Sequence, residues 1–366
     1  RQFVNRMQFL NRHDLVDRLL QQTDEFKQLL ESDAEIPLQH YFDVNAYLDR
    51  ATLEGAYLDV VHFFEIKMSL RTIRDSLRFI SGAEEGKYEA LKALGANVTV
   101  ERSLIAALDK VVDDAGAVRD DATPELQRLK RDLISQQSIL RKQIQSIIKH
   151  AKNEGWTPSD VEPTIRGGRL VIPVIAEHKR RIKGLIHDES ATGQTVYIEP
   201  ESIFELNNDI KDLENAYHRE LIRILIGLTN TLRHHIPELR KAYQYLGLLD
   251  FIRAKAAFAR RVEATRPTLH KYPHINWRKA THPLLFLAHR QVGKPTVPMD
   301  LELNRDQRIL LISGPNAGGK SVSLKTVGLL QYMVQCGMLI PVEDGSEAGI
   351  FHDIFIDIGD EQSIEN

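Results

Sequence analysis

The sequence predicts a multidomain protein: a mainly α lever, an antiparallel helical stalk with a small β-rich tip, and part of an α/β domain with a phosphate-binding loop. Three observations lead to this prediction. Apolar residues recur at helical spacing through most of residues 1–265, and two of these stripes continue over many turns. A glycine-rich loop of the pattern G-x-x-x-x-G-K-[ST] then follows an apolar run at residues 309–312. The length of 366 residues also exceeds one ordinary domain.

Composition and charge narrow the functional class. The chain is 42% hydrophobic and 27% charged, as soluble globular proteins are, and its net charge of -3 requires any nucleic-acid contact to come from a local basic surface. The single cysteine, Cys336, excludes an internal disulfide and suits a reducing compartment. No signal peptide or membrane-spanning run is visible, so we expect a cytoplasmic protein with no membrane partner.

Residues 1–120 are predicted to form a helical core and lever. Apolar residues at helical spacing mark several helices, and turn signals such as Ser81-Gly82 separate them. Acidic pairs occur at 84–85, 113–114 and 120–121. No matching histidine or carboxylate constellation accompanies them, so solvated helix faces or turns are favoured over metal or acid–base sites.

Two apolar stripes predict a pair of long helices within residues 121–234. Stripes of this kind are typical of paired helices, and we expect the two to pack antiparallel as a clamp stalk. Residues 235–265 are predicted to return as a helix toward the base of the stalk. The first stripe is Leu126, Leu129, Leu133, Leu140, Ile144 and Ile147, and the second is Leu206, Ile210, Leu213, Tyr217, Leu221, Ile224 and Leu228.

A β-rich tip is predicted over about residues 160–203, between the two stalk helices. Residues 164–174 predict a hairpin around Gly167-Gly168, and the runs 182–186 and 195–198 are also strand-like. Basic residues that could bind nucleic-acid phosphates gather here, although solvated edge-strand residues that prevent aggregation are an equal alternative. These residues are Arg166, Arg169, Lys179, Arg180, Arg181 and Lys183.

Residues 266–366 are predicted to begin a nucleotide-binding domain. Pro267, Pro273 and Pro283 mark the break from the helical part. We expect strands at 296–303 and 309–312, the second one buried, and a helix at 322–338.

The loop between the second strand and that helix has the composition of a phosphate cradle. Its glycines would let backbone N–H groups turn toward an anion, and the helix N-terminus adds partial positive charge. Lys320 is expected to reach the β- and γ-phosphates, and the Ser321 hydroxyl to bind Mg²⁺. The flanking strand and helix argue against a chance glycine-rich turn. The loop is Gly314-Pro315-Asn316-Ala317-Gly318-Gly319-Lys320-Ser321.

This loop, with Pro and Asn after its first glycine, resembles that of the MutS family, which belongs to the ABC-type ATPases. The order of lever, stalk with β tip, lever return and ATPase is also similar, so the resemblance covers essentially the whole chain. The chain resembles the second bacterial branch of the family more closely still. That branch lacks the mismatch-reading N-terminal domain, and consistently no Phe-x-Glu mismatch-reading motif precedes the predicted lever here. The segments that resemble this branch are 168–174, 187–193, 198–200 and 357–363.

The resemblance implies roles for individual residues. Gly314 and Gly319 would form the turns of an ATP-binding loop that Pro315, Ala317 and Gly318 complete. Asn316 would lie near the γ-phosphate or the attacking water, so that Asn316 and Lys320 are the expected catalytic residues, and Ser321 is the expected Mg²⁺ ligand.

Two further segments, His282-Pro283-Leu284 and Val297-Pro298, resemble the stretch that flanks adenine in MutS proteins. Val297 is therefore a candidate adenine contact, with a place in the core as the alternative.

Residues 354–357 look like a Walker B strand but follow Lys320 too soon, because a signature helix intervenes in ABC-type proteins. The resemblance therefore implies an earlier strand, with Gln362 at a Q-loop-like position. Walker B, the catalytic Glu and the signature Ser would lie beyond Asn366. The chain, which starts with Arg1, is interpreted as a fragment cut inside its ATPase domain, and we expect it to turn over ATP poorly.

The resemblance implies a bacterial homodimer that uses ATP and Mg²⁺ to clamp branched DNA and suppress recombination. Nuclease activity would come only from a C-terminal Smr domain. The alternative is a ribosome quality-control factor that grips rRNA and splits stalled or collided ribosomes, and the sequence does not separate the two. Lys320 beside two glycines argues against a purely structural rod, and no Asn-Lys-x-Asp motif supports a GTPase.

Overall fold

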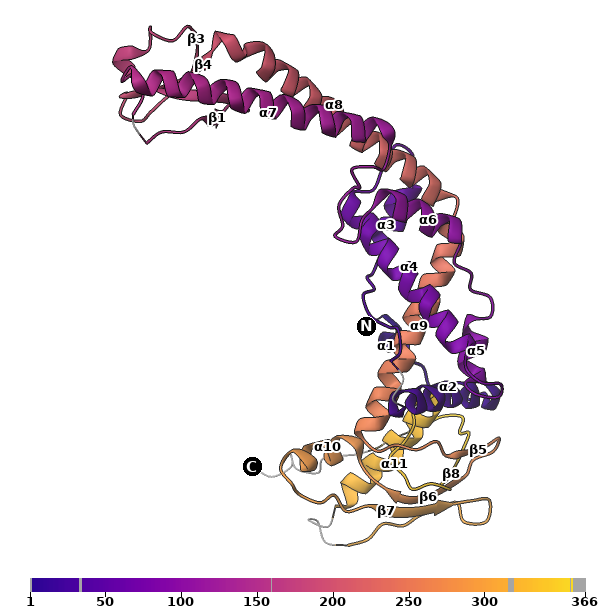
Figure 1. Ribbon diagram of the computed structural model, residues 1–366. Helices are drawn as coiled ribbons and strands as arrows, with labels where there is room; N and C mark the ends of the chain where they lie inside the picture. Colours follow the sequence, from indigo (N-terminus) through magenta and orange to yellow (C-terminus); the bar gives the residue numbers. More distant parts are fainter. Residues whose placement is uncertain (1, 33–34, 159, 315–318, 356, 358–366) are drawn as a thin grey trace. The chain divides into compact units, whose positions relative to one another are not determined.

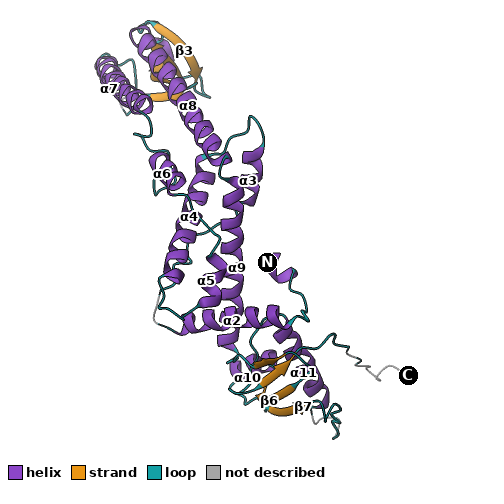
Figure 2. Ribbon diagram, turned by 90° about the vertical axis from the view of Figure 1, so that its right-hand side faces the viewer, coloured by secondary structure: helices purple, strands orange, loops and turns teal. Residues whose placement is uncertain are grey.

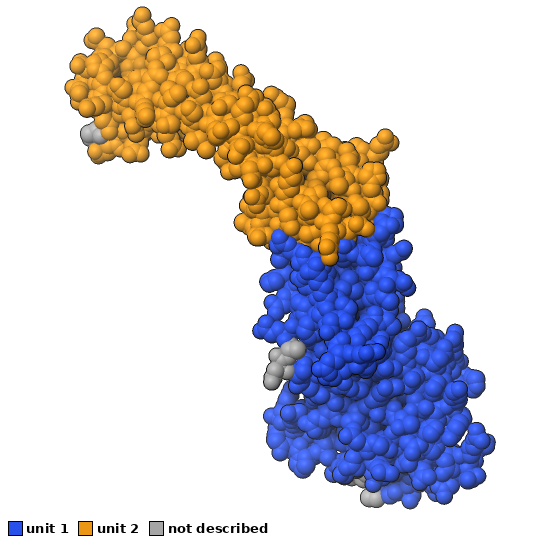
Figure 3. Space-filling view, turned by 45° about the vertical axis from the view of Figure 1, so that its right-hand side comes forward, with its two compact units in different colours: residues 1–42, 68–100, 236–366 blue, residues 43–67, 101–235 orange. Residues whose placement is uncertain are grey.

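The structure is a computed structural model that describes residues 2–32, 35–158, 160–314, 319–355 and 357. These residues form two compact units, each assembled from segments that are distant in the sequence (Figure 3). Unit 1 consists of Arg1–Phe42, Met68–Val100 and Ile236–Asn366, and unit 2 of Asp43–Lys67 and Glu101–His235. None of the described helices combines the length and apolar character needed to cross a membrane.

Unit 2 is dominated by the two long antiparallel helices that the apolar stripes predict (Figure 1). The hydroxyl of Thr123 caps the first of them by accepting the Leu126 N–H (3.1 Å). Thr123 also donates to Glu220 (2.8 Å), while Gln143, further along the same helix, donates to the Ser202 carbonyl (3.0 Å), so the two helices run in opposite directions. The helices of the unit are α3 (Asn45–Thr52), α6 (Arg102–Val111), α7 (Pro124–Asn153), α8 (Phe204–Arg233) and the start of α4 (Val60–Ser81).

A β-rich tip lies beside α7 and α8 (Figure 2). It is a four-stranded antiparallel sheet in the order β1-β2-β4-β3. Gly167 (φ 58) and Gly168 (φ 76) form the two-residue turn of the predicted hairpin, because both positions lie in the left-handed region that favours glycine. One face of the sheet packs Ile172, Val174 and Ile198 against Ile144 of α7. The strands are β1 (Thr164–Arg166), β2 (Arg169–Ile175), β3 (Gly184–Glu189) and β4 (Thr195–Pro200).

Unit 1 contains a mixed sheet in the order β5-β8-β6-β7, in which only the β5–β8 pair is parallel. Its core joins Trp277 of the sheet to Leu330 and Val334 of α11, Leu20 of α2 and Ala259 of α9. The elements are α1 (Gln2–Asn5), α2 (His13–Glu31), α5 (Glu89–Gly95), α9 (Ile236–Arg261), β5 (Thr268–His270), β6 (Ile275–Ala280), α10 (Pro283–Gln291), β7 (Met299–Leu303), α11 (Lys320–Gln335), β8 (Glu347–Gly349) and the rest of α4.

The predicted buried strand at residues 309–312 is wrong. This run has no regular structure, and its side chains are exposed, with Ile309 at 91% and Leu311 at 88%. A strand buried in a parallel sheet needs hydrogen-bonded neighbours on both sides. Among the described residues, no strand pairs with this run, because β5 to β8 pair with one another.

Two other strand predictions also differ from the structure. The strand expected at 296–303 begins only at Met299, and the described residues of 354–357 form no strand. The helix expected at 322–338 is α11, which ends at Gln335, before Gly337 (φ 70) turns the chain.

Candidate functional site

The two ends of the glycine-rich loop meet at the start of α11. Gly319 immediately precedes the helix with φ 83, a conformation that favours glycine. The ammonium group of Lys320 donates a hydrogen bond to the carbonyl oxygen of Gly314, on the other side of the loop. Pro315, Asn316, Ala317 and Gly318 lie outside the described residues.

The N-terminus of α11 is suited to an anion. Ser321 is exposed in its first turn, and that turn carries no acidic side chain. Free backbone N–H groups and the helix dipole give this end partial positive charge, to which Lys320 adds a full one. The structure therefore places the expected phosphate lysine and the expected Mg²⁺ ligand side by side on one helix end.

The other end of α11 is held rigidly by buried glutamines. Gln335, which is fully buried, donates to the carbonyls of Leu10 (2.7 Å) and Phe351 (2.8 Å) and accepts the Phe351 N–H (3.0 Å). Gln331 donates to the carbonyl of Gly349 on β8 (2.9 Å). Because the buried Gln335 amide is hydrogen-bonded through both its nitrogen and its oxygen, it fixes α11 to the segments before α2 and after β8.

The turn after α11 also contacts α2 and α9. The carbonyl oxygen of Gly337 accepts hydrogen bonds from Thr23 of α2 (2.9 Å) and from the buried ammonium of Lys255 of α9 (3.0 Å). A side chain at Gly337 would place its Cβ 2.4 Å from the Cβ of Leu19. This close approach requires glycine and ties the helix that follows the loop to both α2 and α9.

Lys255 makes the stability of this junction dependent on pH. Burial lowers the pKa of Lys255 from 10.5 to about 8, because the charged form loses its hydration. Below pH 8 the lysine is charged in both the folded and the unfolded chain, and its burial costs about 3 kcal/mol. That cost disappears as the pH rises from about 8 toward 10.5, so the free energy of unfolding should increase over this range.

We expect Lys255→Met to remove this increase and to stabilise unit 1 at pH 7 by about 1–3 kcal/mol. The measurement is denaturant unfolding between pH 7 and pH 9.5. Both proteins should carry Cys336→Ala, because burial raises the pKa of the Cys336 thiol and its titration gives the opposite slope. Parallel pH profiles with and without Lys255 would contradict the prediction.

Of the two segments expected to flank adenine, Val297-Pro298 lies on the surface of unit 1, whereas Pro283 of the other is buried. Val297 is 88% exposed, which rules out the alternative that it belongs to the core and leaves the adenine contact as a prediction. Thr296, beside it, is hydrogen-bonded to His289 (3.1 Å) at the end of α10. His282 caps the start of α10 by accepting the Leu285 N–H (3.4 Å), and its burial lowers its pKa.

The basic residues of the tip fall into two groups. Lys179, Arg180, Arg181 and Lys183 are exposed around the start of β3. Arg181 and Lys183 also line a surface hollow of about 480 Å³, whose wall includes Trp156. An aromatic ring beside exposed cations is suited to nucleic acid, because bases stack on aromatic faces while cations bind phosphates.

The second group, Arg166 and Arg169, has internal partners. Arg166 lies 3.1 Å from the Asp188 carboxylate and over the ring of Tyr197. Arg169 donates to Glu199 (2.7 Å) and to Asn208 (2.5 Å).

A buried ion network around Glu199 was not predicted from the sequence. The Glu199 side chain is 1% exposed, and its carboxylate is bound by Arg169 (2.7 Å), His187 (2.6 Å) and the Asn207 amide (2.8 Å). Asn207 also bonds both backbone groups of Leu170, 3.3 Å to its N–H and 3.2 Å to its carbonyl. The network joins the segments 168–174, 187–193 and 198–200. All three resemble the same family branch, and this shared resemblance was the signal in the sequence that could have indicated the network.

Comparison with known proteins yields one consistent set of relatives. The chain is 36% identical over 347 residues to the endonuclease MutS2 of Geobacillus sp. (strain WCH70), covering 94% of this chain and 43% of that protein. It is 34% identical to the endonuclease MutS2 of Halalkalibacterium halodurans, with the same coverage, and 34% identical to that of Pelotomaculum thermopropionicum, over 100% of this chain and 45% of the relative. No protein-family model matches the chain. The chain thus spans less than half the length of these relatives.

Proposed function

We propose, because this chain belongs to the MutS2 family, that it binds ATP with Mg²⁺ at loop 314–321 and couples the nucleotide to nucleic-acid binding by the tip of unit 2. The observation that carries the proposal is the start of α11, where Gly319, Lys320 and Ser321 are presented on a helix N-terminus without acidic residues. In the intact protein the activity would be ATP hydrolysis by a homodimer in the bacterial cytoplasm.

The proposal gives each loop residue a role. Lys320 would leave the Gly314 carbonyl and bind the β- and γ-phosphates, while the Ser321 hydroxyl would bind Mg²⁺. Asn316 is proposed to orient the attacking water, Gly318 and the other loop residues to cradle the phosphates, and Val297 to contact the adenine. ATP would supply the reacting phosphate, and Mg²⁺ would supply the positive charge that neutralises it.

The exposed run at 309–312 supports a nucleotide site that other strands complete. Four consecutive apolar side chains, from Ile309 to Ile312, are exposed at 38% or more, which is unfavourable unless another surface covers them. We propose that strands from the rest of a longer protein pair with this run. On that proposal, the present chain alone turns over ATP poorly, because its phosphate shell is incomplete.

A path for coupling is available inside unit 1. Movement of α11 on nucleotide binding would act on α2 through Thr23 and on α9 through Lys255, since both side chains hold the Gly337 carbonyl. Interfaces of this kind respond to a ligand by shifting between discrete packed arrangements. We propose that α2 and α9 serve as the lever elements.

The nucleic acid is proposed to be branched DNA, and suppression of recombination the resulting function. The relatives carry the name endonuclease, and cleavage by this protein is proposed only through a further domain of a longer chain. The exposed cations of the tip, which would contact backbone phosphates, favour a nucleic acid over a protein partner without selecting a sequence. The same cations would suit ribosomal RNA.

The test is binding of the full-length protein, with and without ATP, to a four-way DNA junction, linear duplex DNA and collided ribosomes at one fixed salt concentration. Nucleotide-dependent preference for the junction is the expected result. Preference for collided ribosomes that is lost in Lys320→Ala would replace it with a role in ribosome rescue.

Replacing Arg180, Arg181 and Lys183 together by Ala is expected to weaken nucleic-acid binding about tenfold or more and to lower the salt slope by about 2–3, because each phosphate contact contributes about 0.9 to that slope. The measurement is affinity at several salt concentrations.

The matched control for that variant replaces Lys110, Arg131 and Arg219, which are exposed cations of unit 2 outside the tip. Equal losses in the two triple variants would show that only net charge matters and would contradict a specific tip site.

A further inference from the structure

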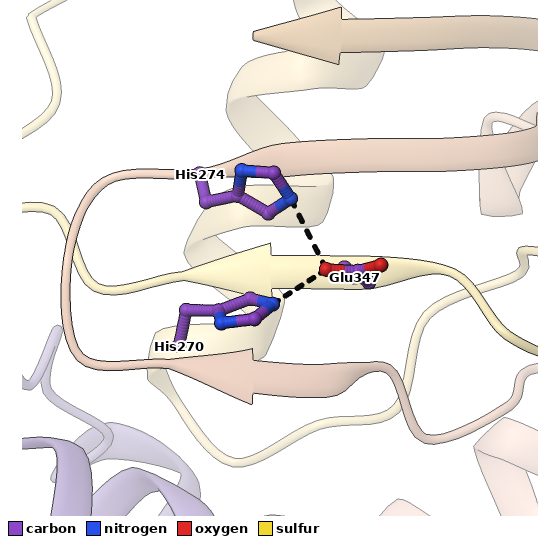
Figure 4. Close-up of side chains that lie close together, drawn as sticks. All are labelled: His270, His274 and Glu347. Carbon is purple, nitrogen blue, oxygen red and sulfur yellow. Dashed lines mark hydrogen bonds and ion pairs between the residues drawn. The ribbon is translucent and has the colours of Figure 1, made fainter. Parts of the chain in front are cut away.

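His270, His274 and Glu347 converge on one face of the sheet of unit 1, although no sequence motif links them (Figure 4). Glu347 lies on the inner strand β8, opposite Thr268 on one side and Asn276 on the other. Side chains alternate along a strand, so residues two positions from these partners share the face of Glu347. Those residues are His270, after Thr268, and His274, before Asn276.

The three side chains bring their ligand atoms together. One nitrogen of each imidazole and one carboxylate oxygen all lie within 4.8 Å of one another. The Nε2 atoms of His270 and His274 lie 2.5 Å and 3.2 Å from the same oxygen of Glu347. The rings of the two histidines are edge-to-face, with centroids 4.8 Å apart, and both present a nitrogen to the carboxylate (Figure 4).

One of these nitrogens has Glu347 as its single recorded contact. The Nε2 atom of His274 is buried and, apart from its 3.2 Å ion-pair contact with Glu347, has no hydrogen-bond partner among the described residues. A buried polar nitrogen without a hydrogen bond is unfavourable, and a bound ion is one of the few ways to satisfy it. The side chain as a whole is only 15% exposed, so water has little access.

The backbone holds the cluster in place. Gly349 packs against the turn between the two histidines so closely that a Cβ would lie 2.0 Å from the carbonyl oxygen of Tyr272 and 2.4 Å from the nitrogen of His274. The Ile350 N–H donates to the carbonyl of His270 (3.2 Å). These contacts hold the turn in place against β8, so the ligand atoms need no large rearrangement to bind one ion.

We propose that His270, His274 and Glu347 bind a divalent transition-metal ion of the Zn²⁺ class, with a fourth position open to water. Two imidazoles and one carboxylate are a known donor set for Zn²⁺. In a tetrahedral site with bonds of about 2.0–2.1 Å, the ligand atoms lie about 3.3 Å apart. The observed separations between these atoms differ from that ideal spacing by between a few tenths of an ångström and about 1.5 Å. Mg²⁺ is disfavoured because it prefers oxygen ligands.

This site is separate from the ATP site, because none of its residues belongs to loop 314–321. The ion would fasten β5 and the turn before β6 to β8, and Gly349 of β8 accepts the hydrogen bond from Gln331 of α11. We therefore expect the metal to stabilise unit 1 whether or not nucleotide is bound.

The experiment is titration of the untagged, chelator-treated chain with Zn²⁺ by calorimetry, and with Co²⁺ by visible absorption, which reports tetrahedral coordination. We expect one ion per chain, a tetrahedral Co²⁺ spectrum and a raised melting temperature. His274→Asn and Glu347→Gln, both close in size to the original residues, should each weaken binding at least tenfold. His352→Ala, which removes an exposed histidine of the same unit, should bind as the unmodified chain does.

Absence of binding in the unmodified chain, or equal affinity in all variants, would overturn the proposal. Circular dichroism of each variant guards against misfolding: a folded His274→Asn that keeps full Zn²⁺ affinity counts against the site, and a folded one that loses it counts in favour. The metal test is independent of the proposed ATP site, because the expected Zn²⁺ binding is the same whether or not Lys320→Ala abolishes ATP binding.

Discussion

Lys320→Ala is expected to weaken binding of ATP-Mg²⁺ at least about 30-fold, since one hydrogen-bonded charge on a phosphate contributes about 2 kcal/mol or more. In the full-length protein the same change should reduce ATP turnover about 10²–10³-fold, because the lysine also neutralises charge that develops in the transition state. The measurements are calorimetric titration with ATP-Mg²⁺ and steady-state phosphate release.

Lys325→Ala is the matched control for this prediction. It removes an exposed cation from the same helix, α11, without touching the loop. If ATP bound both variants equally, the loop would not be the nucleotide site. Steady-state phosphate release by the present chain tests its proposed incompleteness, because steady turnover that is abolished by Lys320→Ala would show that no further strands are required.

Glu199→Ala is expected to destabilise the β-rich tip by about 3 kcal/mol. The carboxylate is 1% exposed, and its removal leaves Arg169 and His187 without their partner and Asn207 with an unpaired donor. We place the loss at the lower end for a broken buried ion pair, because Arg169 is 32% exposed and water can partly replace Glu199. Hydrogen exchange of residues 164–200 would report the local opening directly.

Two further variants make the prediction for Glu199 sharper. Glu199→Gln keeps an acceptor for Asn207 but loses the charge, so its effect should be intermediate. Glu189→Ala removes an exposed carboxylate from the neighbouring strand β3 and should leave exchange unchanged. Similar protection of the tip in Glu199→Ala and Glu189→Ala would show that the network does not hold the sheet together.

Glu199→Ala also distinguishes between two explanations of nucleic-acid binding by the tip. If only net charge attracted phosphates, loss of the negative charge of Glu199 would strengthen binding. If the network positions the tip, Glu199→Ala should instead weaken binding despite the more favourable charge. An increase in affinity at fixed salt would therefore contradict a positioning role for Glu199.

The elements that the sequence predicted well depend on local signals. The apolar stripes of α7 and α8 appear as a 3.6-residue period, and Thr123 before Pro124 marks where α7 begins. Gly167-Gly168 supports the turn between β1 and β2 because both residues have positive φ. Each of these features is set by residues a few positions apart, so the sequence alone contains the necessary information.

The run 309–312 shows where local signals fail. Its apolar residues have the composition of a buried strand, yet burial depends on neighbours that only the tertiary structure supplies, and among the described residues none pairs with it. Val297 is a similar case, because an apolar residue in an irregular segment has no periodicity from which its exposure could be inferred.

The prediction of a phosphate-binding loop at 314–321 needed the sequence alone, because its candidate residues are consecutive and lead directly into one helix. The Glu199 network and the cluster of His270, His274 and Glu347 were decided only by the tertiary structure. Their members are brought together by strand register, as when β8 inserts between β5 and β6 and places Glu347 between two histidines. Register is set by the packing of whole sheets, and a one-residue shift would turn Glu347 to the opposite face.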